Sequence, residues 1–386
     1  MKIGIISHYR ALILDGNYGT LFQNWALQSY LNHRGHETTW VRTKYYSSRK
    51  KRKSTLSRNI KALLVRYGFG APRISPSPHK RPYQAFFRKY VPFSEYEYYA
   101  DDLQRNPPKV DAFLVGSDQV WNSPSPLMFL EFAPAGTLRV AYAASANWKR
   151  LPATWPEDFS APLSRLDAVS VRENEGLELC KKAGRSDTQH VLDPALLPKK
   201  QDYLQLVQLE GDDIPAPKPF VFSYFVGFDE AYSAPLPKLR DVAKNAQLDL
   251  QIDIVQQHGG SLPAGISPTV NPTPTQWLNA FNSSRFVVTN SFHGMVFSII
   301  FKTPFLVVLR NASENPGHER MMNVLTALNL QQRAITLEAF ENKSYDEIQS
   351  LLEAEIQWES VTLRLDKLRS KSKAFLDSAL GVPKPA

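Results

Sequence analysis

Cysteine is nearly absent from this chain of 386 residues, in which Cys180 is the single example. One thiol cannot form an internal disulfide or a cysteine-based metal cluster. The sequence also lacks any apolar run near the roughly 18 residues that a membrane-spanning helix requires. Residues 1–7 (MKIGIIS) are too short and wrongly flanked for a signal peptide, and they are typical of a first strand. We therefore expect a cytoplasmic protein.

Acidic residues are in deficit, because 46 lysines and arginines face 37 aspartates and glutamates, which gives a net charge of +9. Much of the positive excess lies in residues 42–66. We interpret this stretch first as a solvated loop and helix face. Peripheral contact with an anionic membrane is the alternative, because Tyr45 and Tyr46 interleave with the charges. No nucleic-acid-binding module accompanies the basic stretch, so we expect no nucleic-acid partner.

Apolar runs of strand length alternate along the chain with amphipathic helical patterns. The strand candidates are residues 2–7, 37–41, 112–116, 139–144, 168–172, 190–192, 220–226, 250–255, 286–289 and 305–309. Helices are expected at residues 20–34 and 175–183, each closed by a glycine. Continuous apolar runs are typical of parallel strands that are covered on both faces. The alternation therefore predicts an α/β fold built from doubly wound, Rossmann-like units.

The alternation breaks after residue 198, and residues 210–219 (EGDDIPAPKP) have the composition of a linker. We place a domain boundary near residue 215. The predicted parts are an N-terminal Rossmann-like domain over 1–215 on the acceptor side, a second Rossmann-like domain over 216–345 that carries His293, and C-terminal helices over 346–386. The C-terminal helices are amphipathic and suited to packing back across the first domain.

Polar side chains follow several strand candidates at the point where a helix begins. In an open α/β sheet this is where ligands bind. The first such corner is residues 15–20 (DGNYGT), where Gly16 and Gly19 permit a tight turn and close approach to a ligand. Thr20 is a plausible N-cap. The turn lacks the GxGxxG pattern of a dinucleotide site, and a turn that only caps a helix is equally compatible with it.

The next three corners carry an acid, a cation and a second acid. Asp118, in LVGSDQVWN, is a candidate base or sugar ligand, and Trp121 is a candidate stacking partner for a sugar ring. The alternative is that Asp118 caps the next element and Trp121 lies in the core. Arg172 offers a guanidinium fork for a carboxylate or phosphate, unless it pairs with a neighbouring glutamate. Asp193 ends a strand before a proline, either as a functional acid or as an Asx turn.

The fifth corner, residues 289–294 (TNSFHG), joins a strand of buried type to an almost wholly apolar helix. Unpaired N–H groups at a helix N-terminus suit an anion, and His293 adds an imidazole there. A lone histidine is usually a core residue, but this one occupies a polar corner, so we favour a functional role. Arg310 ends the following strand and is the best of the nearby cations, while Arg320 belongs to a group expected mostly at the surface. Together the corners predict one cleft between two domains.

In chain order, the motifs GNYGT, GSDQVWN, AYAAS, SVRE, LDP and NSFHG resemble those of the polysaccharide pyruvyltransferase family. The resemblance implies a GT-B-like architecture with two Rossmann-like domains facing across a cleft. It also implies transfer of pyruvate from phosphoenolpyruvate to a sugar, typically as a ketal on a precursor of a cell-surface polysaccharide. Many relatives carry an arginine where this chain has Ser291. We therefore expect the anion-binding role to pass to Arg172, Arg310 or Lys302, or to be lost.

The implied chemistry assigns a role to each candidate residue. His293 in its protonated form is the expected acid, and Asp118 is the expected base. Arg172 and the N–H groups from Ser291 to Gly294 are expected to stabilise the phosphate and carboxylate. The remaining substrate-binding candidates are Asn17, Tyr18, Gly19, Trp121, Asn122, Asp193 and Arg310. The scheme requires no metal and no cofactor, since phosphoenolpyruvate is itself the donor substrate.

Two other functions stay open at this point. A glycosyltransferase dependent on a nucleotide sugar has the same architecture, but it releases a nucleoside diphosphate rather than phosphate. A non-catalytic glycan-binding relative is the second alternative, and the missing arginine at Ser291 mildly favours it. The acceptor sugar is expected to be nucleotide- or lipid-linked. A lipid carrier would give the basic residues 42–66 a purpose at the inner face of the membrane.

Overall fold

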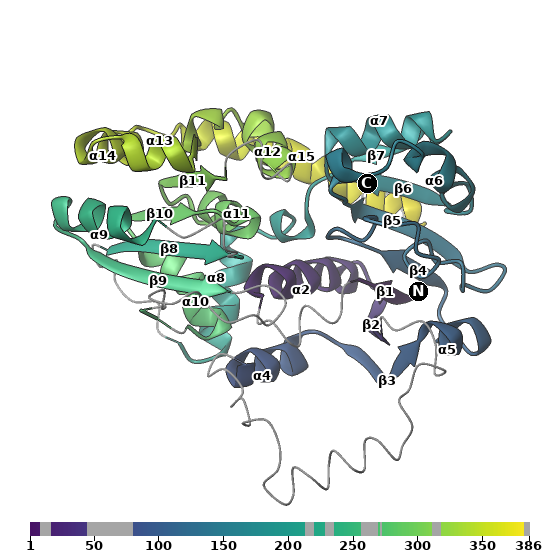
Figure 1. Ribbon diagram of the computed structural model, residues 1–386. Coiled ribbons are helices and arrows are strands. Elements are labelled where there is room, and N and C mark those ends of the chain that lie inside the picture. The colour runs from purple at the N-terminus through teal and green to yellow at the C-terminus, as the bar shows by residue number, and fades with distance from the viewer. Residues whose placement is uncertain are drawn as a thin grey trace, which may run out of the picture.

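The strands form two parallel sheets with helices on their faces, as the computed structural model shows (Figure 1). The structure describes residues 1–7, 17–44, 80–212, 220–227, 235–255, 269–270, 272–310 and 318–381. The first sheet has seven strands in the order β3-β2-β1-β4-β5-β6-β7, and the second has five in the order β12-β11-β10-β8-β9. All of the pairs within them are parallel. The predicted α/β fold is therefore confirmed.

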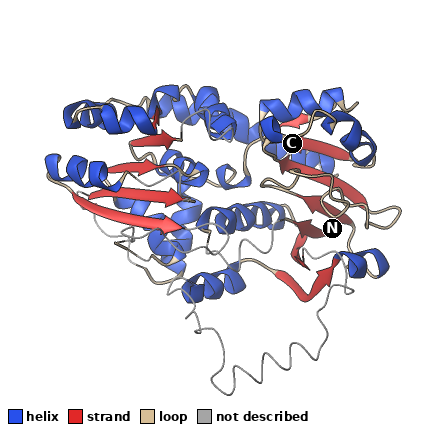
Figure 2. Ribbon diagram, in the orientation of Figure 1, coloured by secondary structure: helices blue, strands red, loops and turns tan. Residues whose placement is uncertain are grey.

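Strands and helices alternate through both sheets (Figure 2). The strands are β1 Lys2–Ile6, β2 Glu37–Lys44, β3 Phe93–Tyr99, β4 Ala112–Val115, β5 Leu138–Ala144, β6 Ala168–Val171, β7 Gln189–His190, β8 Phe220–Val226, β9 Asp249–Val255, β10 Phe286–Thr289, β11 Phe305–Leu309 and β12 Ala334–Thr336. The helices of the first part are α2 Tyr18–His33, α4 Lys80–Tyr90, α5 Ala100–Arg105, η2 Trp148–Arg150, α6 Trp155–Ser164, α7 Asn174–Lys182, η3 Pro194–Leu196 and α8 Lys200–Leu209. Those that follow are α9 Leu236–Asn245, α10 Pro274–Ser283, α11 Phe292–Phe301, α12 Glu319–Leu328, η6 Gln331–Arg333, α13 Leu337–Asn342, α14 Tyr345–Glu353 and α15 Trp358–Ala379.

Every predicted strand occurs, but β3 and β12 were not expected. β3 (FSEYEYY) lies at the edge of its sheet, and none of its side chains is fully buried. An exposed edge strand of this kind lacks the continuous apolar run from which a buried parallel strand can be predicted. β12 has three residues, which is too short for a periodic pattern. The two sheets divide the chain between β7 and β8, and the boundary placed near residue 215 lies outside the described residues.

The last helix, α15, returns to the first sheet, as its yellow ribbon behind β5 and β7 shows (Figure 1). Phe375 and Leu376 pack in one cluster with Ile3 and Ile5 of β1. Asp377 accepts hydrogen bonds from Tyr30 and Arg34 at the C-terminal end of α2. The C-terminal helix therefore covers the first sheet and clamps the far end of α2.

The largest apolar cluster joins the two sheets rather than belonging to one of them. Phe22 of α2 stacks on Trp277 of α10, with ring centroids 5.8 Å apart, and meets Phe297 of α11 edge-on at 5.5 Å. Aromatic pairs of this kind add about 0.5–1.5 kcal/mol each beyond the area they bury. The first helix of the chain is thus held against the helices of the second sheet.

One carboxyl, that of Asp253 on β9, lies inside this junction without a partner. The residue is 0% exposed, and neither oxygen accepts a hydrogen bond from a described residue. It stands opposite Tyr224 of β8 in the sheet register. Burial raises the pKa of Asp253 to about 8. Asp253 is therefore protonated in the folded protein at neutral pH.

Replacing Asp253 with asparagine should remove a pH-dependent loss of stability. Because the folded pKa is raised, the wild type loses unfolding free energy as pH rises from about 4 towards 8, by at most about 1.4 kcal/mol per pH unit. Asp253→Asn should lack this slope, so its stability relative to wild type should grow across that range. Urea unfolding at pH 5 and pH 8 measures the difference. Asp249→Asn, at an exposed position of the same strand, is the control, and equal slopes for Asp253→Asn and wild type would refute the expectation.

Candidate active site

The corner between β10 and α11 is built by short polar contacts. The Thr289 hydroxyl donates to the Tyr224 carbonyl and accepts from the Ser291 N–H. Ser291 is the N-cap of α11, and its Oγ accepts from the Gly294 N–H at 3.3 Å. A Cβ on Gly294 would lie 2.3 Å from Thr289 Oγ1, so this position requires glycine. Ser291 and Gly294 therefore shape the corner that presents His293.

His293 lies where the N-termini of α2 and α11 meet. Its side chain is 12% exposed, and Nε2 lies 3.8 Å from Oδ1 of Asp193. The other face of the ring touches Gly19 of α2, where a Cβ would come within 2.2 Å of Nδ1. Nε2 is buried and makes no hydrogen bond within the described part of the chain. The imidazole of the second half is thus enclosed by residues of the first half.

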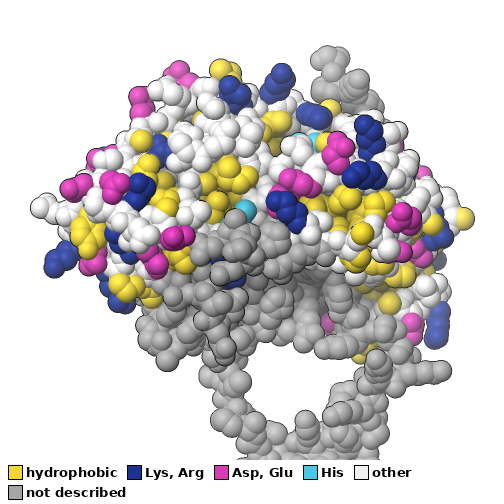
Figure 3. All heavy atoms as spheres, turned by 45° about the horizontal axis from the view of Figure 1, so that its top comes forward, with side chains coloured by type: hydrophobic (Ala, Val, Ile, Leu, Met, Phe, Trp, Pro, Cys, Tyr) yellow, Lys and Arg dark blue, Asp and Glu magenta, His cyan; other side chains and the backbone are white. Residues whose placement is uncertain are grey.

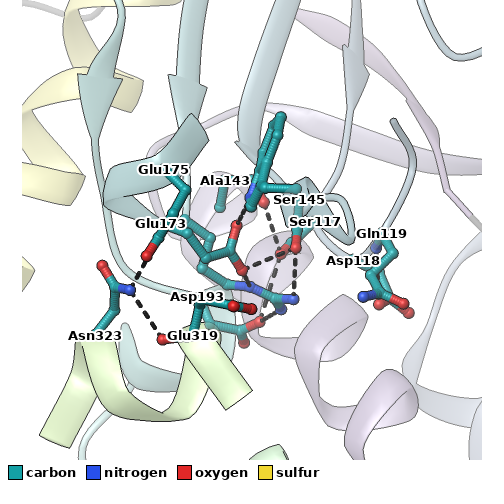
Figure 4. Close-up of polar contacts among 12 residues, drawn as sticks. Ser117, Asp118, Gln119, Ala143, Ser145, Glu173, Glu175, Asp193, Glu319 and Asn323 are labelled. Carbon is teal, nitrogen blue, oxygen red and sulfur yellow. Dashed lines mark hydrogen bonds and ion pairs between the residues drawn. The ribbon is translucent and has the colours of Figure 1, made fainter. Parts of the chain in front are cut away.

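Asp193 belongs to a buried network centred on Arg172. Figure 4 shows three other members of this network, Asp193, Glu173 and Ser145, lying close together. Arg172 donates from Nη1 to Asp193 at 2.6 Å, from Nε to Glu173 at 3.0 Å and from Nη2 to Ser145 at 3.1 Å. Trp148 donates to the second oxygen of Glu173 at 2.8 Å. The guanidinium also stacks on the Phe292 ring, 4.6 Å from its centroid. This network supports the carboxylate that faces His293.

The network determines which groups carry charge. Burial opposes the charge on Arg172, but Glu173 and Asp193 outweigh it and raise the pKa of Arg172 above its usual value. Burial likewise opposes the charge on Asp193, yet His293 and Arg172 hold the pKa of its carboxyl well below its usual range. Arg172 is 1% exposed and its charge is committed to two carboxylates. It therefore acts as the support of Asp193 rather than as an open fork.

The first corner of the sequence differs from its prediction. Asn17, not Thr20, is the N-cap of α2, and its side chain accepts from the Thr20 N–H at 3.3 Å. Tyr18 was expected to face substrate, but it is buried, stacks on Trp277 and donates its hydroxyl to the Pro272 carbonyl. Gly19 makes the predicted close approach, but to His293. Gly16 lies outside the described residues.

In the second corner, residues 114–122, some of the candidate residues lie at the surface and others in the core. Trp121 is 0% exposed, stacks on Phe129 and donates to the Met128 carbonyl, so its predicted stacking on a sugar is wrong. Asn122 is exposed and accepts from a backbone N–H at 2.7 Å. Asp118 is half-buried, has a left-handed φ of 81° and accepts from the Gln119 N–H. Asp118 therefore lies at the end of β4, to one side of the Arg172 network (Figure 4).

The candidate cations of the second half, Arg310, Lys302 and Arg320, lie in different places relative to His293. Arg310 is half-buried and donates to the Gly227 carbonyl at 2.6 Å. Lys302 caps the C-terminal end of α11, opposite the end that carries His293, so it cannot serve the same anion. Arg320, which was expected with the surface residues, lies in the first turn of α12 with its guanidinium 5.8 Å from the Phe292 centroid. Its place at the start of the helix after β11 was the signal in the sequence that could have found it.

Charges of both signs are interspersed on the described surface of the face shown in Figure 3. Within the described residues, no group of three or more histidine, cysteine or acidic side chains is arranged to hold a metal. No helix in the described ranges is long and apolar enough to cross a membrane. The basic stretch from residue 45 onwards lies outside the part that the structure describes.

The fold and the junction site define a GT-B-like protein, with two parallel α/β sheets and a histidine held between them. The chain belongs to the polysaccharide pyruvyl transferase family, whose model matches residues 17–311. This match confirms the family suggested by the motif series. No curated protein matches the sequence.

Solved structures share the fold at low sequence identity. The chain is similar to the UDP-N-acetylglucosamine 2-epimerase from Rickettsia bellii, with 12% identity, coverage of 99% of this chain and 96% of that chain, and a TM-score of 0.54. It is also similar to the UDP-GlcNAc 2-epimerase from Neisseria meningitidis bound to UDP-GlcNAc, with 11% identity, 99% and 100% coverage and a TM-score of 0.51. UGT89C1 from Arabidopsis thaliana complexed with UDP gives 12% identity, 99% and 100% coverage and a TM-score of 0.51. These likenesses show the architecture alone.

The contact between Gly19 and His293 predicts a specific coupling between the two halves. Alanine normally favours a helix over glycine by about 1 kcal/mol. Here Gly19→Ala should instead destabilise the protein by about 1–3 kcal/mol, because its Cβ overlaps the imidazole. In a His293→Ala background the same change should be neutral or stabilising. A double-mutant cycle of unfolding free energies measures the coupling, and equal costs in both backgrounds would contradict the contact.

Proposed function

We propose that this protein transfers pyruvate from phosphoenolpyruvate to a sugar of a polysaccharide precursor and forms a ketal. The observation that carries the proposal is His293, enclosed between the two halves and facing the ionised Asp193, in a chain of this family. We place the reaction in the cytoplasm, where phosphoenolpyruvate is a soluble metabolite. A family assignment without this site would support only a fold, because function resides in sites.

The reaction needs an acid, an anion site and a base. A proton added to the methylene carbon of phosphoenolpyruvate leaves an oxocarbenium-like centre at C2. One sugar hydroxyl adds to C2 and loses its proton, and the C2–O bond to phosphate then breaks. A second hydroxyl of the sugar adds to C2 and also loses its proton, which closes the ketal. The products are the pyruvylated sugar and inorganic phosphate.

His293 is the proposed acid. The Asp193 carboxylate lies 3.8 Å from Nε2 and stays ionised because Arg172 pairs with it. A carboxylate facing the ring at this distance can help to orient the imidazole of a general acid. The partial positive charge at the N-termini of α2 and α11 favours an anionic substrate at the same place.

Asp118 is the proposed base for the attacking hydroxyl. It lies at the carboxyl end of β4, half-buried, on the first half of the molecule. The Ser145 N–H donates to its main-chain carbonyl at 3.0 Å and helps to hold its left-handed backbone. A carboxylate at the end of a strand in the first sheet is suited to activate a hydroxyl of an acceptor that binds over this sheet. Exposed Asn122 is the remaining polar candidate there.

Loss of the imidazole should abolish transfer without unfolding the protein. His293→Gln should lower kcat for phosphoenolpyruvate-dependent phosphate release by roughly 10²–10⁴-fold, since general acid catalysis contributes about that factor. Mass spectrometry of the acceptor should show a gain equal to pyruvate minus water for the wild type only. His33→Gln, at an exposed position of α2, is the control. A variant at position 293 with near-normal turnover would remove His293 from the acid role.

The products separate this proposal from the other classes. A nucleotide-sugar-dependent transferase releases a nucleoside diphosphate, and a non-catalytic glycan-binding protein releases neither product. Phosphate release that requires both phosphoenolpyruvate and a sugar acceptor is the result expected here. Phosphate release without a pyruvylated product would point instead to simple hydrolysis.

We propose that the acceptor is nucleotide- or lipid-linked and that residues 42–66 draw the protein to an anionic membrane in the lipid-linked case. The proposal rests on the positive charge of that stretch, because basic residues near an anionic surface contribute about 1 kcal/mol each. Sedimentation with anionic vesicles should exceed sedimentation with neutral ones, and added salt should reduce the difference. Equal and negligible binding to both kinds of vesicle would refute the proposed membrane contact.

A further inference from the structure

Two arginines lie over the Phe292 ring at this corner, and only Arg172 forms ion pairs with described residues. Arg172 donates to Glu173 and Asp193 and is fully buried with them. Arg320, on α12, makes no ion pair or hydrogen bond among the described residues, and its Nε is buried without a partner. Both guanidinium groups lie over the Phe292 ring, at 4.6 Å and 5.8 Å. The site therefore contains one guanidinium without an ion pair, which lies over the ring of Phe292, the residue before His293.

The carboxylates whose charge acts on Arg320 are those of Asp118, Glu173 and Asp193, and none of them forms an ion pair with it. Glu319, its neighbour in sequence, pairs with Lys149 at 2.5 Å. Glu173 and Asp193 already hold Arg172. Glu175 accepts from Asn323, one turn further along α12. Arg320 is therefore close enough to these carboxylates to be influenced by their charge, but it forms no ion pair with a described acidic residue.

The position of Arg320 is unfavourable for a cation in three respects. Burial lowers the pKa of Arg320, and the like charge of Arg172 lowers it further against the opposing carboxylates. The residue also lies in the first turn of α12, where the helix dipole favours negative charge. Arginine cannot escape this cost by losing its proton, because its ordinary pKa lies above 12. One bound anion would supply negative charge that offsets all three of these costs.

The start of α12 is tied to the first half on both sides of Arg320. Lys149 of η2 holds Glu319, while the Asn174 N–H donates to the Asn323 side chain at 3.0 Å. Figure 4 shows the side chains of Asn323 and Glu175 meeting between α12 and α7. The Arg320 backbone is therefore held at a set position relative to the Arg172 network. The guanidinium of an arginine whose backbone is fixed is suited to bidentate recognition of an oxyanion.

We propose that Arg320 binds the phosphate group of the acidic donor substrate, while Arg172 only supports Asp193. This assignment rests on the proposed function for the identity of the donor, but not for the existence of the anion site. Arg320 would supply the cation that is absent at Ser291, from α12 instead of α11. After transfer, the same fork would hold the inorganic phosphate that is released.

Arg320→Gln should remove the phosphate site. For the wild type, calorimetric titration with inorganic phosphate should give binding that weakens roughly 10- to 100-fold in Arg320→Gln, as expected for hydrogen bonds to a charged group. The KM for phosphoenolpyruvate should rise by a similar factor, with a smaller change in kcat. Arg320→Lys should retain part of the affinity, because it keeps the charge but loses the fork. Arg364→Gln, at an exposed position of α15, is the matched control and should behave as wild type.

Thermal unfolding separates a binding role from a structural one. If Arg320 binds phosphate, Arg320→Gln without phosphate should be at least as stable as the wild type, and phosphate should raise the Tm of the wild type only. A lower Tm without phosphate, together with unchanged phosphate affinity, would overturn the assignment. Phosphate binding that depends on Arg320, in a protein without pyruvyl transfer, would refute the proposed function and leave the anion site standing. Normal transfer by Arg320→Gln with an unchanged KM would refute the anion site alone.

Discussion

The ion pair between Arg172 and Asp193 is the interaction on which the junction site depends. Removing either charge from water costs several kcal/mol, and the cost is offset only if each charge has partners. Here Glu173 and Ser145 satisfy the other Arg172 nitrogens, and the Ala195 N–H donates to the second Asp193 oxygen. The network lies at the ends of β6 and β7, in the first half of the molecule. Its result is one ionised oxygen directed at an imidazole in the second half.

The contact between Gly19 and His293 fixes the position of the imidazole that faces the Asp193 carboxylate. Two helix N-termini can approach this closely because one of them carries glycine at the point of contact. Behind the contact, Phe22 and Trp277 belong to an apolar cluster shared by both sheets. The cluster buries aromatic surface on one side of the junction, so the polar ends of α2 and α11 are brought together by packing and not by their own attraction. The apolar core therefore sets the distance at which the polar groups act.

Continuous apolar runs were enough to predict the α/β fold and the described strands other than β3 and β12, because burial on both faces of a parallel sheet leaves that pattern. The corner of His293 was predictable for a similar reason, as a polar turn between a buried strand and an apolar helix. Tyr18 and Trp121 were not, since an aromatic residue at a polar corner has the same local pattern whether it faces a sugar or the core. Arg320 was not assigned to the site either, although it begins the helix after β11. Its neighbour Arg172 lies far away in sequence, and only the tertiary packing of α12 brings the two together.

Asp253 and Arg320 show two ways in which an unpartnered ionisable group can persist inside a folded chain. Asp253 avoids a buried charge by keeping its proton, since burial raises the pKa of its carboxyl to about 8. Arg320 has no such route, because a guanidinium stays charged at any pH at which the protein is folded. The carboxylates of Asp118, Glu173 and Asp193 act on its charge, yet none of them forms an ion pair with it. A cation kept at this cost beside a candidate catalytic histidine is explained by a ligand that brings the missing negative charge.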